Sequence, residues 1–167
     1  MTASQQTIDG RPALRFERRL EHSIERVWRA VTEPDELRQW FVSEVPWTPA
    51  ASEVFEAGGE TGRITALDPP HLIAWTWGVE RYRFELAPQG DGCRLVFTHV
   101  FNPDLGPDWQ HAAGWETYLN RLDAHLAGGF LSELDAHADI DELLERYRSR
   151  FATEPSSPTP SRRLDPR

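Results

Sequence analysis

The sequence of 167 residues predicts an α+β fold in which a curved antiparallel sheet of about seven strands wraps around a long C-terminal helix. Three observations lead to this prediction. A first alternating segment is followed by two short helical segments. Further alternating segments, separated by turn residues, then continue to about residue 101. A long stripe of apolar residues at helical spacing comes next, and one more helical stripe follows it.

The N-terminal part supplies one strand and two helices. Leu14, Phe16 and Leu20 share one face of an alternating segment, which indicates a half-buried strand. Ser23 stands at the N-cap position of the first helix, where its hydroxyl can satisfy a free backbone N–H. Pro34 takes the favoured early position of the second helix. Residues 1–11, which precede the strand, are expected to form a flexible leader.

The middle of the chain has the pattern of an antiparallel meander. The strand candidates lie at 41–47 and 54–57, where the pattern is weak, and at 62–67, 72–77, 82–86 and 94–101. The segments between them carry turn residues, as in Asp68-Pro69-Pro70 and Gln89-Gly90-Asp91-Gly92.

Two helices follow the meander. The stripe from Ala112 to Leu126 predicts a long helix over about 107–127, and the stripe from Ile140 to Phe151 predicts another over 139–151. The chain therefore divides into a flexible leader (1–11), a sheet-and-helix domain (12–128), a C-terminal helical extension (129–151) and a disordered tail (152–167). We expect the extension to pack back onto the domain, with a dimer contact as the alternative, so the protein is a monomer or a homodimer.

Composition excludes some partners. The net charge of −9 argues against nucleic acid, because phosphate binding needs a basic face. No apolar run is long enough to span a membrane. The single cysteine, Cys93, cannot form an internal disulfide, which favours a cytoplasmic location. The six histidines include no pair at helical ligand spacing and there is no phosphate-binding loop, so neither a metal nor a cofactor is predicted.

Several ordered motifs carry a family resemblance. They are Val27-Trp28-Arg29-Ala30-Val31-Thr32-Glu33-Pro34, Gly62-Arg63-Ile64, Trp75-Thr76-Trp77, Thr98-His99 and Gly114-Trp115. In this order they resemble the AHSA-like family, which is related to activators of the heat-shock chaperone ATPase and belongs to the START-like (SRPBCC) superfamily. The resemblance covers about residues 12–127. It implies a helix-grip fold with a cavity between the sheet and the long helix.

The resemblance implies several functions rather than one. Related proteins include ligand carriers, cyclases, stress-associated proteins and co-chaperone domains. The stretch from Trp47 to Gly62 looks shorter than in the family pattern, so a small cavity is expected.

His99 and Arg18 are the candidates for chemistry. Strand alternation puts His99 on the face of Leu95 and Phe97, toward the long helix, where it could bind a ligand or act as a base. The alternative is a buried histidine that is satisfied by a neighbour. Arg18 shares the face of Phe16, so it pairs with an acid, holds an anionic ligand or extends its head to water at the strand end.

The many aromatic residues either line a cavity for a flat hydrophobic molecule or simply fill the core. On the first interpretation, the ligand-binding residues are Arg18, Trp40, Trp47, Tyr82, Phe84, Phe97, His99 and Trp115.

The favoured hypothesis is a non-enzymatic binding protein for a small apolar or aromatic ligand, with a stress-related role implied by the resemblance. A cyclase- or hydrolase-like enzyme that uses His99, with Arg18 or Glu116, is the first alternative. It requires these side chains to converge on one open cavity. A chaperone-assisting protein that binds a protein client is the second alternative.

Overall fold

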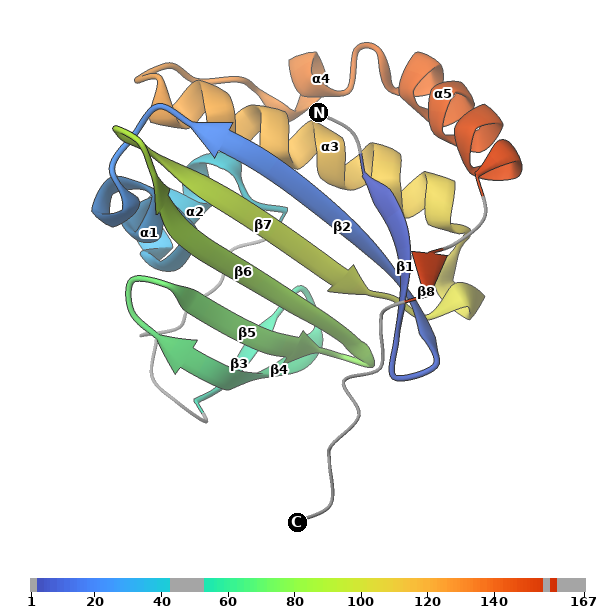
Figure 1. The fold of residues 1–167 in the computed structure, drawn as a ribbon, viewed down its shortest axis with the longest axis horizontal. Helices are drawn as coiled ribbons and strands as arrows, with labels where there is room; N and C mark the ends of the chain where they lie inside the picture. Colours follow the sequence, from blue (N-terminus) through green and yellow to red (C-terminus); the bar gives the residue numbers. More distant parts are fainter. Residues whose placement is uncertain (1–2, 43–52, 155–156, 159–167) are drawn as a thin grey trace.

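The sheet curves around one long helix. The computed structural model describes residues 3–42, 53–154 and 157–158. Helix α3 (Asp108–Leu126) runs along one face of the sheet, and α1 (Ile24–Thr32) and α2 (Pro34–Trp40) lie beside it (Figure 1). The predicted α+β helix-grip fold is confirmed. The oxygen of Ser23 accepts the backbone N–H of Arg26 over 3.2 Å, so the predicted N-cap is present as well.

The sheet contains seven antiparallel strands and one short parallel strand in the described residues. Their order across the sheet is β3 (Val54–Ala57), β4 (Glu60–Asp68), β5 (Leu72–Trp77), β6 (Glu80–Gln89), β7 (Gly92–Val100), β2 (Arg11–Leu20), β1 (Ser4–Ile8) and β8 (Ser157–Pro158). Strands β3 to β7 form the predicted meander, and β2 pairs with β7 from the other side.

Strand β1 corrects the prediction for the N-terminus. Residues 1–11 were expected to be a flexible leader, but Ser4–Ile8 pairs along its whole length with β2. Asp9 and Gly10 form the connection with φ values of 51° and 74°, as a two-residue hairpin turn requires. The strand contains one apolar residue in five, so it gave no hydrophobic alternation to detect.

Two other expectations also need correction or fall outside the described residues. The strand predicted at 41–47 starts at Phe41, which instead caps the C-terminus of α2. Residues 43–47, and with them Trp47, lie outside the described residues. The tail was predicted to be disordered from residue 152, but Ser157 and Pro158 pair in parallel with β1.

The strand register builds an aromatic layer on the concave face. Tyr82 pairs with Trp75 on one side and with His99 on the other, and Phe84 pairs with Phe97. The rings of Phe84 and Phe97 lie 4.8 Å apart, and both side chains are fully buried. Bulky rings therefore fill the middle of the space between sheet and helices, in agreement with the core-filling interpretation.

The C-terminal extension covers the outer side of α3. Helix α4 (Glu133–Ala136) is short, and α5 (Ile140–Thr153) packs its apolar face on α3 (Figure 1). Tyr147 of α5 is fully buried, and its hydroxyl donates to Glu116 and accepts the backbone N–H of Ala3 over 2.9 Å. One side chain thus joins α5, α3 and the N-terminus. No helix within the described ranges has the length and apolar character of a membrane span.

Candidate functional site

A cavity of about 350 Å³ lies between the sheet and the first turns of α3. Aromatic side chains form most of its wall, and a few polar groups come together at its floor. The described residues that line it are Val42, Trp77, Glu80, Tyr82, His99, Leu105, Gln110, His111, Gly114, Trp115 and Tyr118.

His99 lies at the floor with both ring nitrogens occupied. The indole N–H of Trp115 donates to Nδ1 over 3.0 Å, and Nε2 lies 2.9 Å from Oε2 of Glu80. An indole nitrogen can only donate, so Nδ1 must be the acceptor and the proton must sit on Nε2. His99 therefore donates to the Glu80 carboxylate as a neutral imidazole.

Glu80 is the centre of this polar group. Its Oε2 also accepts the hydroxyl of Tyr82 over 2.7 Å, and its Oε1 accepts the backbone N–H of Asn102 over 3.3 Å. Burial raises the pKa of Glu80, but the hydrogen bonds from His99 and Tyr82 outweigh burial and hold its pKa at about 2. Burial and the same carboxylate raise the pKa of the Tyr82 phenol. The floor thus carries an ionised carboxylate and a neutral phenol.

His111 supplies a second imidazole from α3. Its ring lies 5.2 Å from that of His99 and 4.7 Å from that of Phe101. Burial lowers the pKa of His111, which favours its neutral form. Its Nε2 is buried and has no hydrogen-bond partner among the described residues. This atom is enclosed by the protein and does not face the open space of the cavity.

Glu80, His99 and His111 bring three potential metal ligands within 4.8 Å of one another. Two histidines and a carboxylate are a donor set that suits zinc and other transition metals. A metal-bound histidine, however, normally donates its other N–H to an acceptor. His99 has the reverse arrangement, because Trp115 donates to Nδ1 and the proton occupies Nε2. The arrangement of His99 and Glu80 therefore suits a hydrogen-bonded pair better than two ligands of a metal ion.

The structure separates the residues predicted to bind ligand into groups. Tyr82, His99 and Trp115 come together at the cavity. Trp40, Phe84 and Phe97 are fully buried in the packed core and do not line the cavity. Trp40 therefore does not reach the cavity, and its indole N–H donates to the carbonyl of Ala30 over 2.8 Å.

Arg18 lies at a separate hollow of about 360 Å³ near the other end of α3. Its guanidinium pairs with Asp123 and donates to the side chain of Asn120 over 2.9 Å. The interpretation in which it pairs with an acid therefore holds, and no charge is left for an anionic ligand.

The enzyme hypothesis required His99 and either Arg18 or Glu116 to converge on one open cavity, and the described residues do not show this convergence. Arg18 bonds to Asp123, and Glu116 bonds to Arg146 and Tyr147 of α5. Neither side chain lines the cavity that holds His99. Both nitrogens of His99 already have partners, so its ring is not free to take a proton from a bound molecule.

The sequence interpretation missed Glu80 and His111, although each left a signal. Glu80 has the same strand parity as Tyr82 and Phe84, so alternation alone places it on the concave face. His111 precedes Trp115 by one helical turn and shares its side of α3. What could not be foreseen was that the register of β6 and β7 brings Glu80 within reach of His99.

Fold and site together define a helix-grip domain with a small, mostly aromatic cavity. The family model described as "Activator of Hsp90 ATPase homolog 1-like protein" matches residues 21–127. The chain belongs to this family, as the sequence motifs predicted. A search of curated proteins finds no match to the chain.

Solved structures agree on the fold. CalU16 from Micromonospora echinospora is 19% identical, with a TM-score of 0.75 over 90% of this chain and 92% of that one. Protein EF2215 from Enterococcus faecalis, described as of unknown function, is 21% identical, with a TM-score of 0.73 over 90% of each chain. An AHSA1-like protein from Aeromonas hydrophila is 17% identical, with a TM-score of 0.62 over 70% of this chain and 92% of that one.

Proposed function

We propose that the protein binds a small, flat, mostly apolar molecule in the cavity between β6, β7 and α3. The observation that carries this proposal is Gly114, which lies inside α3 and lines the cavity wall. A Cβ at this position would meet no atom within 4 Å. No neighbour requires a glycine here, and glycine inside a helix costs about 0.5–1 kcal/mol relative to alanine. The missing side chain keeps the cavity open.

The cavity wall suits a planar ligand. Trp77, Tyr82, Trp115 and Tyr118 surround the space, with Val42 and Leu105 at its exposed edge. A volume of about 350 Å³ is near the lower end of small-molecule sites, which suits a body of one or two rings. Most of the binding free energy would come from burying such a body, at about 25 cal/mol for each Å² of apolar surface.

A cavity-filling variant tests the proposal. Gly114→Leu places a branched side chain into the space, whereas Gly114→Ala adds one methyl group. Ala127→Leu adds the same side chain at an exposed position just after α3 and serves as the control. Wild type and Ala127→Leu should bind a naphthyl-sized probe with equal affinity in calorimetric titration, and Gly114→Leu should lose binding. Equal binding by wild type, Ala127→Leu and Gly114→Leu would disprove the proposal.

A protein client is the second candidate function, consistent with the family description. It is favoured by Phe130 and Leu134, which flank the start of α4 and are 68% and 84% exposed. Contiguous exposed apolar side chains mark contact surfaces, so these two residues would form the centre of a client-binding patch. A double variant, Phe130→Ser with Leu134→Ser, should reduce co-purification of a client without changing probe binding. Unchanged co-purification would rule out this surface.

A further inference from the structure

The charges of the cavity indicate which ligand it takes. Among the described lining residues Glu80 is the one acid, and there is no arginine. His99 is neutral because Trp115 fixes its tautomer, and burial favours the neutral form of His111. The whole chain carries a net charge of −9, which adds to the negative potential. An anionic ligand would be buried beside a carboxylate with no opposite charge to balance it.

The aromatic wall favours the opposite charge. The ring of Tyr82 lies 6.2 Å from that of Trp77 and 5.7 Å from that of Trp115, and Trp115 lies 6.0 Å from Tyr118. The rings of Trp77, Trp115 and Tyr118 thus line the space beside Glu80, whereas the faces of the Tyr82 ring are stacked on Trp75 and His99. Aromatic faces attract a cation within about 6 Å of their centroids, and the attraction grows when water is excluded.

An acceptor for hydrogen bonds remains at the floor. Oε1 of Glu80 accepts one long bond, 3.3 Å from the amide of Asn102, so it can accept another. One carboxylate oxygen of Glu80 and one nitrogen of each imidazole lie within 4.8 Å of one another, so a donor group at Glu80 would also lie beside the two imidazoles. An ammonium group carries several N–H donors and a positive charge, which suits the Glu80 carboxylate and the surrounding rings.

We infer that the ligand is an organic amine in its protonated form, with an ammonium group at Glu80 and a flat apolar body between the aromatic side chains. This inference rests on the proposed function and makes it more specific. It requires no step that forms or breaks a covalent bond. The aromatic wall matches the flat body, and the ionised Glu80 carboxylate at the floor matches the ammonium group.

Three probes of one shape test the inference. They are 2-(2-naphthyl)ethylamine, the corresponding alcohol 2-(2-naphthyl)ethanol, and 2-naphthylacetate as the anion. In calorimetric titrations at pH 7, the amine should bind wild type at least tenfold more tightly than the alcohol, and the acetate should not bind. In Glu80→Gln the preference for amine over alcohol should fall to about twofold or less, while the alcohol keeps its affinity.

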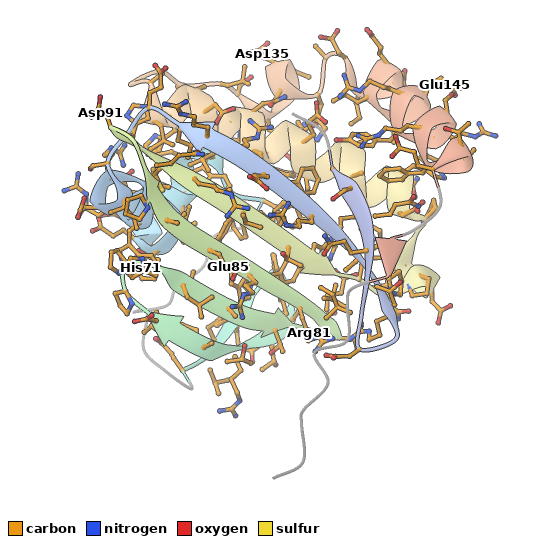
Figure 2. All side chains as sticks on the ribbon, in the orientation of Figure 1. His71, Arg81, Glu85, Asp91, Asp135 and Glu145 are labelled. Atoms are coloured by element: carbon orange, nitrogen blue, oxygen red, sulfur yellow. The ribbon has the colours of Figure 1, made fainter. Side chains whose placement is uncertain are left out.

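Glu85→Gln is the matched control. Glu85 belongs to the same strand but lies on the outer face of the sheet, where it pairs with Arg83 over 3.0 Å (Figure 2). The Glu85→Gln substitution removes the same charge at a distance from the cavity, so the preference for the amine over the alcohol should stay intact. An equal loss in both variants would mean that net charge alone selects amines, and this would overturn the inference.

The remaining outcomes separate the inference from the proposed function. If wild type binds the alcohol or the acetate as tightly as the amine, the inference is wrong but the cavity still binds ligand. If no probe binds, both are wrong. Tight binding of Zn²⁺ alone that is lost in His111→Ala would also overturn the inference, because the cluster would then be a metal site. Circular dichroism checks the fold of each variant. If Glu80→Gln does not fold, the order of the three probe affinities in wild type decides whether the inference holds.

Discussion

The indole nitrogen of Trp115 lies 3.0 Å from Nδ1 of His99, and this contact determines the state of the whole polar floor. It leaves the proton of His99 on Nε2, which faces the carboxylate of Glu80. Glu80 in turn accepts the hydroxyl of Tyr82. Helix α3 and the two strands β6 and β7 are thus joined by one chain of hydrogen bonds inside the cavity wall.

The first prediction concerns the tautomer of His99. Nitrogen chemical shifts of the imidazole should show a protonated Nε2 and an unprotonated Nδ1 in the wild type. In Trp115→Phe the ring remains but the donor is lost, so Nδ1 is left without a partner and the variant should lose about 1–3 kcal/mol of stability. A wild-type spectrum with the proton on Nδ1 would contradict the geometry and make a metal site plausible again.

Glu80 should make stability depend on pH in the acid range. Its pKa falls from 4.5 to about 2 on folding, so its contribution is complete above pH 4.5 and is lost as pH falls toward 2. The contribution is up to about 3 kcal/mol, since one pKa unit corresponds to about 1.4 kcal/mol. The stability difference between wild type and Glu80→Gln, measured by urea unfolding from pH 7 downward, should shrink over this range. A difference that does not vary with pH would show that Glu80 is not held ionised by the fold.

Tyr147 should control the order of the N-terminal strand. Tyr147→Phe leaves the buried backbone N–H of Ala3 without its acceptor and removes the donor to Glu116. A loss of about 1–3 kcal/mol is expected from the unsatisfied buried groups. Hydrogen exchange should become faster in β1 and remain unchanged in β6. Equal protection of β1 in both proteins would mean that its strand pairing holds it without Tyr147.

Arg18 should affect stability and leave ligand binding unchanged. Its guanidinium contacts Asp123, Asn120 and the carbonyl of Leu119, all on α3. Arg18→Met should cost about 1–3 kcal/mol, because charged hydrogen bonds between sheet and helix are lost. Affinity for the naphthyl probe should remain within twofold of wild type. A large loss of affinity would show that Arg18 contributes to ligand binding.

Hydrophobic periodicity in the sequence was sufficient to predict most of the fold. The long helix was predicted over 107–127 and spans Asp108–Leu126, and the strands of the meander occur where alternation placed them. The missed strand β1 is short and polar, so hydrophobic alternation could not find it. The Asp9–Gly10 pair, a strong hairpin signal, was the available evidence.

The site was only partly predictable. Strand parity placed His99 on the concave face, and Tyr82 was among the predicted ligand-binding residues; both line the cavity. The partner of His99 is Glu80, which is 19 residues away in sequence, and the contact depends on the register between two strands. The burial of Trp40 depends on how α2 sits against the sheet, which no local pattern specifies.

The most direct test of ligand binding in this cavity is an amide and indole NMR titration with 2-(2-naphthyl)ethylamine. The chain has seven tryptophans, whose indole N–H signals report on different places. Those of Trp77 and Trp115, which line the cavity, should shift and saturate together, while that of the fully buried Trp40 should stay in place. Shifts confined to tryptophans outside the cavity, or no shift at millimolar ligand, would contradict the proposed site.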